Sequence, residues 1–252
     1  MIELRSVTKQ YGTTPVVDDG SITIPQGGLT AIIGPNGAGK STLLSLISRL
    51  QPVDSGEITV DGLDVSRTPT DRLAKKLSIL RQENSLTVRL TVRELVTLGR
   101  FPHCQGRPQA RDLEVVEESL VFLGLRELSH RFLDQLSGGQ RQRAFVAMVL
   151  CQDTDYVLLD EPLNSLDMRH AVDMMKRLRD ISVEKNKTVV LVLHDINFAS
   201  VYADNIVALK EGRLHTHGPP SELMTSETLR SLYDLDIPIH EFNGHRIANY
   251  YL

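Results

Sequence analysis

The 252-residue sequence has only two cysteines, no excess of basic residues and no long apolar stretch. Cys104 and Cys151 cannot form a disulfide framework, so the chain fits a reducing compartment. The net charge of −4 and the pI near 6.1 argue against a nucleic-acid-binding protein that relies on a broadly basic surface. The longest apolar stretches, at 156–159 and 188–193, are far shorter than the roughly 20 residues of a membrane-spanning helix.

The first residues also lack the basic start and the apolar centre of a signal peptide. We therefore expect the protein to stay in the cytosol, where it could still dock on a membrane protein. The 41 % hydrophobic and 24 % charged fractions are typical of a globular chain. This length allows one large or two modest domains with a real core.

The N-terminal part of the chain predicts strands around one glycine-rich loop. Apolar and polar residues alternate at 2–4 and 21–24, which predicts short strands within residues 1–28. An apolar run at 29–33 stops at Gly34 and predicts a buried strand. The residues that follow the loop with the spacing of one buried helix stripe are Leu43, Leu46, Ile47 and Leu50.

The rest of the chain predicts a helical stretch from about residue 90 to 152 and then alternating strands and helices. One helix stripe ends at Gly124 and consists of Leu113, Val116, Leu120 and Leu123. Further strands are predicted at 57–60, 156–160, 188–194 and 205–209, a helix at 171–181, another after Pro219-Pro220, and a hairpin around Asn243-Gly244. This alternation predicts an α/β fold with a mainly parallel sheet covered on both faces, in one domain with a helical insertion.

A phosphate-binding loop is predicted between the buried strand and the first helix, where the pattern G-x-x-x-x-G-K-[ST] occurs. Glycines let the backbone direct N–H groups at phosphate oxygens, and the helix adds its positive N-terminal end. Lys40 would reach the β- and γ-phosphates, and the Ser41 hydroxyl would hold Mg²⁺. A chance match arises in about one chain in a hundred of this length. The loop consists of Gly34, Pro35, Asn36, Gly37, Ala38, Gly39, Lys40, Ser41 and Thr42.

Two carboxylates follow the apolar strand at 156–159. In a parallel sheet they reach the carboxyl edge, where ligands bind. Asp160 would complete the Mg²⁺ shell, and Glu161 would orient or deprotonate the attacking water. The alternative is an acidic strand end that faces solvent.

The segment Leu-Ser-Gly-Gly-Gln at 136–140 opens a second helix with a hydroxyl and bare backbone amides. It predicts a second anion-binding helix start, and the alternative is an N-cap serine with flexible glycines. Since Asp160 and Glu161 can serve one nucleotide, we favour a single ligand held between two copies of the chain.

These motifs, with Ser-Leu-Asp at 165–167 and His194, occur in the order and spacing of ATP-binding cassette (ABC) ATPases. The resemblance covers essentially the whole chain. It implies the P-loop NTPase fold with a mainly parallel sheet, an antiparallel β subdomain and a helical subdomain. The expected organisation is one ATP-binding domain at 1–252, with the helical subdomain at about 87–154 and a C-terminal extension at about 218–252.

The resemblance also implies ATP and Mg²⁺ as ligands and assigns roles to further residues. Tyr11 resembles the aromatic residue that stacks on adenine, and Gln82 the glutamine that touches Mg²⁺ and water and faces the membrane subunits. His194 resembles the histidine that holds the γ-phosphate, and Asp167 the residue that crosses the dimer interface. The residues implied to contact nucleotide bound by the opposite protomer are Ser137, Gly138, Gly139 and Gln140.

These assignments have plain alternatives in the sequence. Tyr11 could be a half-buried turn residue, Gln82 a solvated residue at a helix end, and Asp167 a helix N-cap. His194 could be a satisfied histidine at a strand end. Its place in the ordered set of motifs favours the functional interpretation.

The run Gly-Arg-Phe-Pro-His at 99–103 resembles the importers of ferric siderophores, haem and cobalamin. Residues 133–135 and 153–156 resemble the branch for petrobactin-like or other catecholate siderophores. We therefore expect an ATPase of ferric siderophore import, with cobalamin or haem import as the alternative. An exporter's cassette and a non-transport ABC ATPase of DNA repair or translation rank lower. The implied partners are a second copy in a head-to-tail dimer, a membrane permease and, indirectly, a substrate-binding protein, at the cytoplasmic face of the membrane and without nucleic acid.

Overall fold

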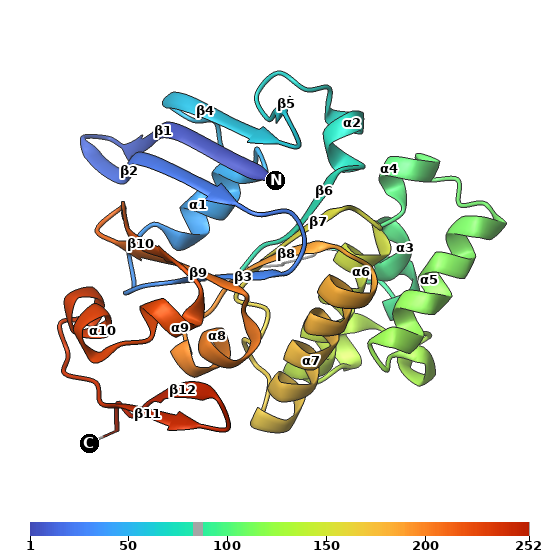
Figure 1. The fold of residues 1–252 in the computed structure, drawn as a ribbon. Coiled ribbons are helices and arrows are strands. Elements are labelled where there is room, and N and C mark those ends of the chain that lie inside the picture. The colour runs from blue at the N-terminus through green and yellow to red at the C-terminus, as the bar shows by residue number, and fades with distance from the viewer. Residues whose placement is uncertain (83–87, 252) are drawn as a thin grey trace.

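The computed structural model describes residues 1–82 and 88–251, and its centre is a six-stranded sheet (Figure 1). The strands are β3 (Leu29–Ile33), β6 (Leu77–Leu80), β7 (Tyr156–Asp160), β8 (Thr188–Val192), β9 (Asn205–Lys210) and β10 (Arg213–Gly218). Their order is β10-β9-β3-β8-β7-β6, and every pair is parallel except β9 with β10. β3, β7 and β8 are buried along their whole length, as parallel strands covered on both faces are.

A second, antiparallel sheet covers one side of this core. It consists of β1 (Ile2–Tyr11), β2 (Thr14–Ile24), β4 (Ser55–Val60) and β5 (Leu63–Asp64), in the order β2-β1-β4-β5. The helix α1 (Lys40–Ile47) lies between the two sheets, and the short helix α2 (Thr70–Ala74) precedes β6 (Figure 1). Leu4, Leu44 and Val190 belong to one apolar cluster, so β1, α1 and β8 share a core.

The predicted helical stretch forms a separate group of helices beside the central sheet (Figure 1). It contains α3 (Val92–Leu98), α4 (Phe101–Cys104), α5 (Ala110–Phe122), α6 (Gly138–Cys151) and 3₁₀ turns at Arg126–Leu128 and Leu133–Gln135. Residue 87, the predicted start of this subdomain, lies outside the described residues.

The run at 99–103 has a structural task within this group of helices. The buried side chain of Arg100 donates from Nε to Asp112 Oδ1 at 3.0 Å and from Nη1 to the Cys151 carbonyl at 2.9 Å. A Cβ at Gly99 would lie 2.1 Å from the Met148 carbonyl oxygen, so α6 passes too close for any larger residue. Gly99 and Arg100 therefore fix α5 and α6 against the end of α3.

The C-terminal half completes the cover of the central sheet. Its elements are α7 (Met168–Glu184), α8 (Ile196–Tyr202), α9 (Pro220–Leu223), α10 (Ser226–Tyr233), β11 (Ile239–Phe242) and β12 (His245–Ala248). The predicted hairpin is present, and Asn243 and Gly244 both have positive φ, as a two-residue hairpin turn requires.

Several local predictions were wrong. Leu50 is 47 % exposed because α1 ends at Ile47. Leu113 is also 47 % exposed, although Val116, Leu120 and Leu123 of the same predicted stripe are fully buried. In the first turn of α5 the buried position belongs to Asp112, which pairs with Arg100. β1 and β2 are longer than the short strands expected, with 10 and 11 residues. β8 ends at Val192, so His194 belongs to the loop that follows.

Within the described ranges, no helix combines the length and the apolar character needed to cross a membrane.

Candidate nucleotide-binding site

The loop after β3 has a backbone that excludes larger residues at two positions. Gly34 and Gly39 have φ values of +144° and +92°. A Cβ at Gly34 would lie 2.1 Å from the Leu209 carbonyl oxygen, and one at Gly39 would lie 2.3 Å from that of Val16. The glycines thus let the loop pass close to neighbouring backbone, which a side chain at either position would prevent.

Lys40 is buried at the start of α1 and turns back over the loop. Its Nζ donates to the carbonyl oxygens of Gly34 and Pro35 at 2.8 and 2.9 Å. Burial lowers the pKa of the Lys40 amine, while the carboxylates of Glu161 and Asp160 act to raise it. The amine is therefore held at the mouth of the loop by two weak acceptors that an anionic ligand can replace.

Ser41 and Asp160 join the loop to the end of β7. The Ser41 hydroxyl donates to Asp160 Oδ1 at 2.9 Å. Burial raises the pKa of the Asp160 carboxyl, and the hydrogen bond from Ser41 opposes this rise. A hydroxyl and a carboxylate side by side, below a phosphate loop, form a set of oxygen donors that suits a hard divalent cation such as Mg²⁺.

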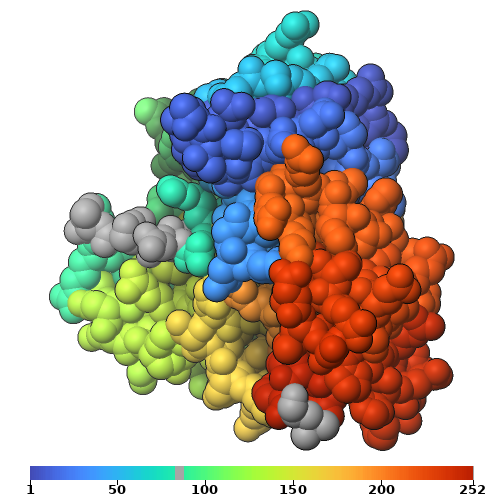
Figure 2. Space-filling model, turned by 90° about the vertical axis from the view of Figure 1, so that its left-hand side faces the viewer, coloured from blue at the N-terminus to red at the C-terminus, as the bar shows by residue number. Residues whose placement is uncertain are grey.

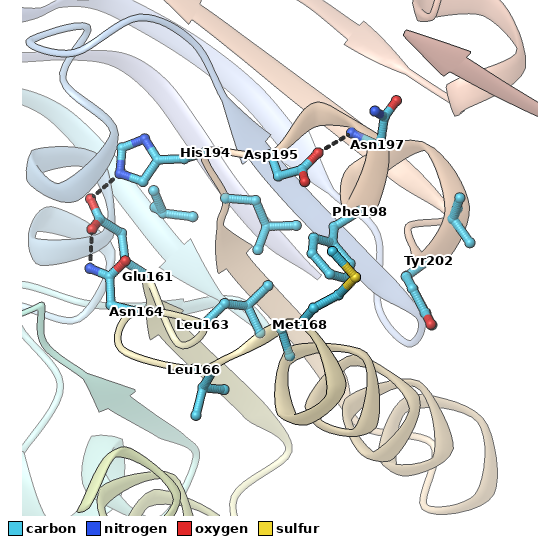
Figure 3. Close-up of a pocket in the computed structure, with 14 residues that line it drawn as sticks. Glu161, Leu163, Asn164, Leu166, Met168, His194, Asp195, Asn197, Phe198 and Tyr202 are labelled. Carbon is cyan, nitrogen blue, oxygen red and sulfur yellow. Dashed lines mark hydrogen bonds and ion pairs between the residues drawn. The ribbon is translucent and has the colours of Figure 1, made fainter. Parts of the chain in front are cut away.

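Glu161 lies directly after β7 with a left-handed backbone, at φ +52°. Its side chain is almost fully buried, and Oε1 lies 2.7 Å from His194 Nε2. The Asn164 amide donates to Oε2, so both carboxylate oxygens have a partner (Figure 3). A non-glycine residue in this backbone region stores strain, which is typical of functional sites.

An open cavity of about 400 Å³ brings the loop and these side chains together. Gln82, which follows β6, reaches it from the far side of β7, and His194 reaches it from the loop after β8. Figure 2 shows the light-blue loop segment at the surface between the N-terminal sheet, the orange strands and the yellow segment. The lining residues are Val16, Asn36, Gly37, Ala38, Gly39, Lys40, Ser41, Thr42, Gln82, Glu161 and His194.

Tyr11 does not line this cavity. It ends β1 with half of its surface exposed, and its hydroxyl donates to the Gln51 side chain. Its ring remains accessible from solvent at the rim of the N-terminal sheet.

The signature segment at 136–140 also stands apart from the cavity in this single chain. Ser137 caps α6, accepting from Gln140 N at 3.3 Å, while Gln140 Oε1 accepts from Ser137 N at 3.1 Å. A Cβ at Gly139 would lie 3.1 Å from the side chain of Leu166, in the loop that follows Glu161. Within the described part of the chain, no residue of this segment lines the phosphate-loop cavity.

Asp167, in the same loop as Leu166, is the N-cap of α7. Its Oδ1 accepts from His170 N at 2.9 Å and lies 2.8 Å from His170 Nδ1. Within one chain, Asp167 therefore acts as a helix N-cap. Its carboxylate is still exposed, so it could also contact a second copy of the chain.

Two neighbours of the site were missed in the sequence. Asn164 holds Glu161, and Tyr233 on α10 lies near the start of the loop. Burial raises the pKa of Tyr233 to about 12, although the backbone of Gly34 acts to lower it. Asn164 lies three residues after Glu161 and could have been suspected, but Tyr233 is far from the loop in sequence and carries no motif.

Comparison with known proteins identifies the family. The family described as "ABC transporter" matches residues 17–164, more than half of the chain. The chain belongs to the ABC transporter ATP-binding family. This ABC ATPase is 52 % identical, over all of both chains, to the petrobactin import ATP-binding protein YclP of Bacillus subtilis (strain 168). It is 49 % identical to the petrobactin import ATP-binding protein FatE of Bacillus anthracis, over 95 % of this chain and 96 % of that one.

The fold prediction is confirmed by a solved structure. The dimeric ATP-binding cassette MJ0796, in a post-hydrolysis state bound to ADP and Pi, matches with a TM-score of 0.79 and 30 % identity. The match covers 87 % of this chain and 99 % of that one. The ABC ATPase is thus an ATP-binding, ATP-hydrolysing subunit whose activity is coupled to transport.

Proposed function

We propose that this ABC ATPase drives the import of a ferric siderophore, of the petrobactin or another catecholate type, through a separate membrane permease. The observation that carries this proposal is the full-length identity of 52 % with a petrobactin import ATP-binding protein. The identity of 49 % with a second such protein supports it. Cobalamin or haem import is the alternative to be tested.

In the proposed site, the phosphate loop binds the phosphates of ATP and Tyr11 stacks on the adenine. Lys40 exchanges its two carbonyl acceptors for β- and γ-phosphate oxygens, since a charged acceptor makes the stronger hydrogen bond. Ser41, Asp160 and Gln82 would hold Mg²⁺, and the hydroxyl–carboxylate pair at 2.9 Å fits that role. When bound, the ion neutralises charge on the phosphates and polarises them.

Glu161 is the proposed general base. Its burial and its two hydrogen-bond partners hold the carboxylate beside the cavity, where a water molecule can be oriented toward the γ-phosphorus. His194 exchanges Glu161 for a γ-phosphate oxygen, and Lys40 and His194 then offset the charge that develops on the transferred group. Gln82 lines the same cavity and orients the water from the side of β6.

The second copy of the chain completes the site. The start of α6 presents a hydroxyl, backbone amides and a helix N-terminus, and it lies outside the phosphate-loop cavity of its own chain. In a head-to-tail dimer, residues Ser137 to Gln140 of each copy would face the nucleotide of the other. Two ATP molecules are then buried between the copies, and closure of the dimer transmits the energy of binding.

The proposed permease surface comprises Gln82 and exposed apolar residues of the helical part of the chain. Val88, Leu98 and Phe101 are exposed there by 64, 49 and 59 %, although large apolar residues are usually buried. A helix of the permease would cover them, and the protein would then lie at the cytoplasmic face of the membrane. The substrate-binding protein, on the other side, is reached through the permease.

Reconstitution with the cognate permease and binding protein tests the substrate. Vesicles that contain this chain should accumulate labelled ferric petrobactin or another ferric catecholate when supplied with ATP and Mg²⁺. Glu161→Gln vesicles serve as the matched control and should not accumulate the label. Uptake of cobalamin or haem in place of every ferric siderophore would overturn the substrate proposal while leaving the ATPase intact.

A further inference from the structure

The helix that follows His194 is tied to the C-terminal end of the chain by a pair of hydrogen bonds. The Asn197 side-chain amide donates to the Ala248 carbonyl at 3.1 Å and accepts from the Ala248 N–H at 2.8 Å. One edge of β12 pairs with β11, and the Asn197 side chain bonds the backbone groups of Ala248 that point away from β11. A planar amide with two reciprocal bonds fixes both the position and the rotation of the first turn of α8.

Further contacts connect the same two segments. Asp195, next to His194 in sequence, caps α8 by accepting from Asn197 N at 2.8 Å (Figure 3), and Tyr250 OH donates to the same oxygen at 3.4 Å. One turn further along α8, Ser200 Oγ donates to the Arg246 carbonyl at 2.6 Å. The C-terminal segment thus reaches the residue adjacent to His194.

The placement of His194 depends on this backbone. Its side chain is 48 % exposed, so packing does little to fix the ring, and the loop between β8 and α8 decides where Nε2 points. A displacement of about 1 Å in a catalytic group can cost up to about 100-fold in rate. Any movement of the first turn of α8 would be passed on to His194 through Asp195, the residue that joins them in the chain.

We propose that Asn197 is a positioning residue for hydrolysis, holding α8 on β12 so that His194 stays within reach of Glu161 and the γ-phosphate. This inference rests on the role proposed for His194. It gives the C-terminal hairpin a part in the reaction, although none of its described residues lines the phosphate-loop cavity.

Steady-state hydrolysis by the full chain tests the inference. Asn197→Ala should lower kcat at least about tenfold while the KM for ATP stays within about twofold. Ser200→Ala removes a hydrogen bond to the same strand one turn away from His194, so it is the matched control and should keep kcat within about twofold. If Asn197→Ala and Ser200→Ala lower kcat equally, the inference is wrong, because the contact would then support the fold in general.

A double-mutant cycle separates positioning from structure. If Asn197 acts through His194, adding Asn197→Ala to His194→Ala should not lower the residual kcat further. If the two residues act independently, the fold-losses of the two single variants should multiply in the double variant. Tyr250→Phe keeps the ring, loses the bond to Asp195, and should lower kcat in the same His194-dependent way even if Asn197→Ala folds poorly. Multiplicative effects for both substitutions would overturn the inference. An unchanged rate in His194→Ala alone would instead overturn the role proposed for His194.

Discussion

His194 Nε2 lies 2.7 Å from Glu161 Oε1, so the two side chains meet although they come from the ends of two different strands. The adjacent, parallel β7 and β8 bring both residues to one edge of the sheet. Because the Glu161 carboxylate is shared between His194 and Asn164, its direction is set before any nucleotide binds. The arrangement makes Glu161 the first residue to test.

Glu161→Gln should lower kcat for ATP hydrolysis about 100-fold or more while ATP binding persists. The amide keeps the shape of the carboxylate but cannot accept a proton from water. The ATP-bound dimer should then accumulate, which size-exclusion chromatography with ATP and Mg²⁺ would detect. Glu211→Gln is the control, since Glu211 is exposed and also has φ near +52°. A variant that hydrolyses ATP at the parental rate would exclude Glu161 as the base.

Lys40→Ala should weaken nucleotide binding about tenfold or more, because the loop loses its charged donor to the phosphates. Titration with a fluorescent ATP analogue measures this affinity. Lys185→Ala, which removes an exposed lysine outside the phosphate-loop cavity, is the control and should leave the affinity unchanged. Equal affinities of the Lys40 and Lys185 variants would contradict the proposed loop.

Mixing two inactive variants should restore hydrolysis if the site is shared. A copy with Ser137→Arg keeps its phosphate loop, and a copy with Lys40→Ala keeps its signature segment, so each mixed dimer has one complete site. An equal mixture should recover up to about a quarter of the parental rate, since about half of the dimers are mixed and each has one of two sites. Absence of any recovery, with dimers present, would argue for a site within one chain.

Arg100→Met should lower the free energy of unfolding by about 3 kcal/mol, because the buried carboxylate of Asp112 would lose its cationic partner and keep only the hydrogen bond from Gln109 N. Urea denaturation measures this loss. Arg111→Met breaks an exposed pair with Glu114 in the same group of helices and should lower the stability far less than Arg100→Met. Similar losses for the two variants would contradict the structural task assigned to Arg100.

The contacts of Asp61 should stabilise the folded protein at neutral pH and lose this effect in acid. Burial acts to raise the pKa of Asp61, but hydrogen bonds from Lys76, the N-terminal amine and Tyr156 outweigh it and hold the pKa well below 3.8. The unfolded chain therefore binds a proton before the folded state does, and stability present at neutral pH is lost as the pH falls.

Urea denaturation between pH 5 and pH 3 checks this expectation. The Asp61 contribution to the slope is at most about 1.4 kcal/mol per pH unit, and it should disappear in Asp61→Asn. Asp71→Asn, at an exposed site on α2, should keep the parental slope. An unchanged slope in Asp61→Asn would show that this carboxylate does not carry the acid sensitivity.

The elements that the sequence predicts best are those with local signals. The phosphate loop and the hairpin at Asn243-Gly244 depend on residues that are adjacent in the chain, and β7 was predicted at its observed bounds. The stripe of α5 was correct at Val116, Leu120 and Leu123 but wrong at Leu113, because an apolar pattern cannot reveal that Asp112 is buried by pairing with Arg100.

The contacts that the sequence could not reveal are polar and long-range. Asn197 and Ala248 are 51 residues apart, and neither has a pattern that marks the other as its partner. Tyr233 meets Gly34 only because α10 folds back toward the start of the loop. Such contacts follow from the tertiary arrangement, so they become visible once the fold is known.

The two carbonyl bonds of Lys40 bear on the kinetics of nucleotide capture. With Gly34 and Pro35 as acceptors, the amine completes a closed ring of backbone and side chain before any phosphate arrives. An incoming nucleotide therefore has to displace both carbonyl oxygens before its phosphates can pair with the amine. Association is then an exchange of partners at one ammonium group, in which phosphate oxygens replace the carbonyl oxygens of Gly34 and Pro35.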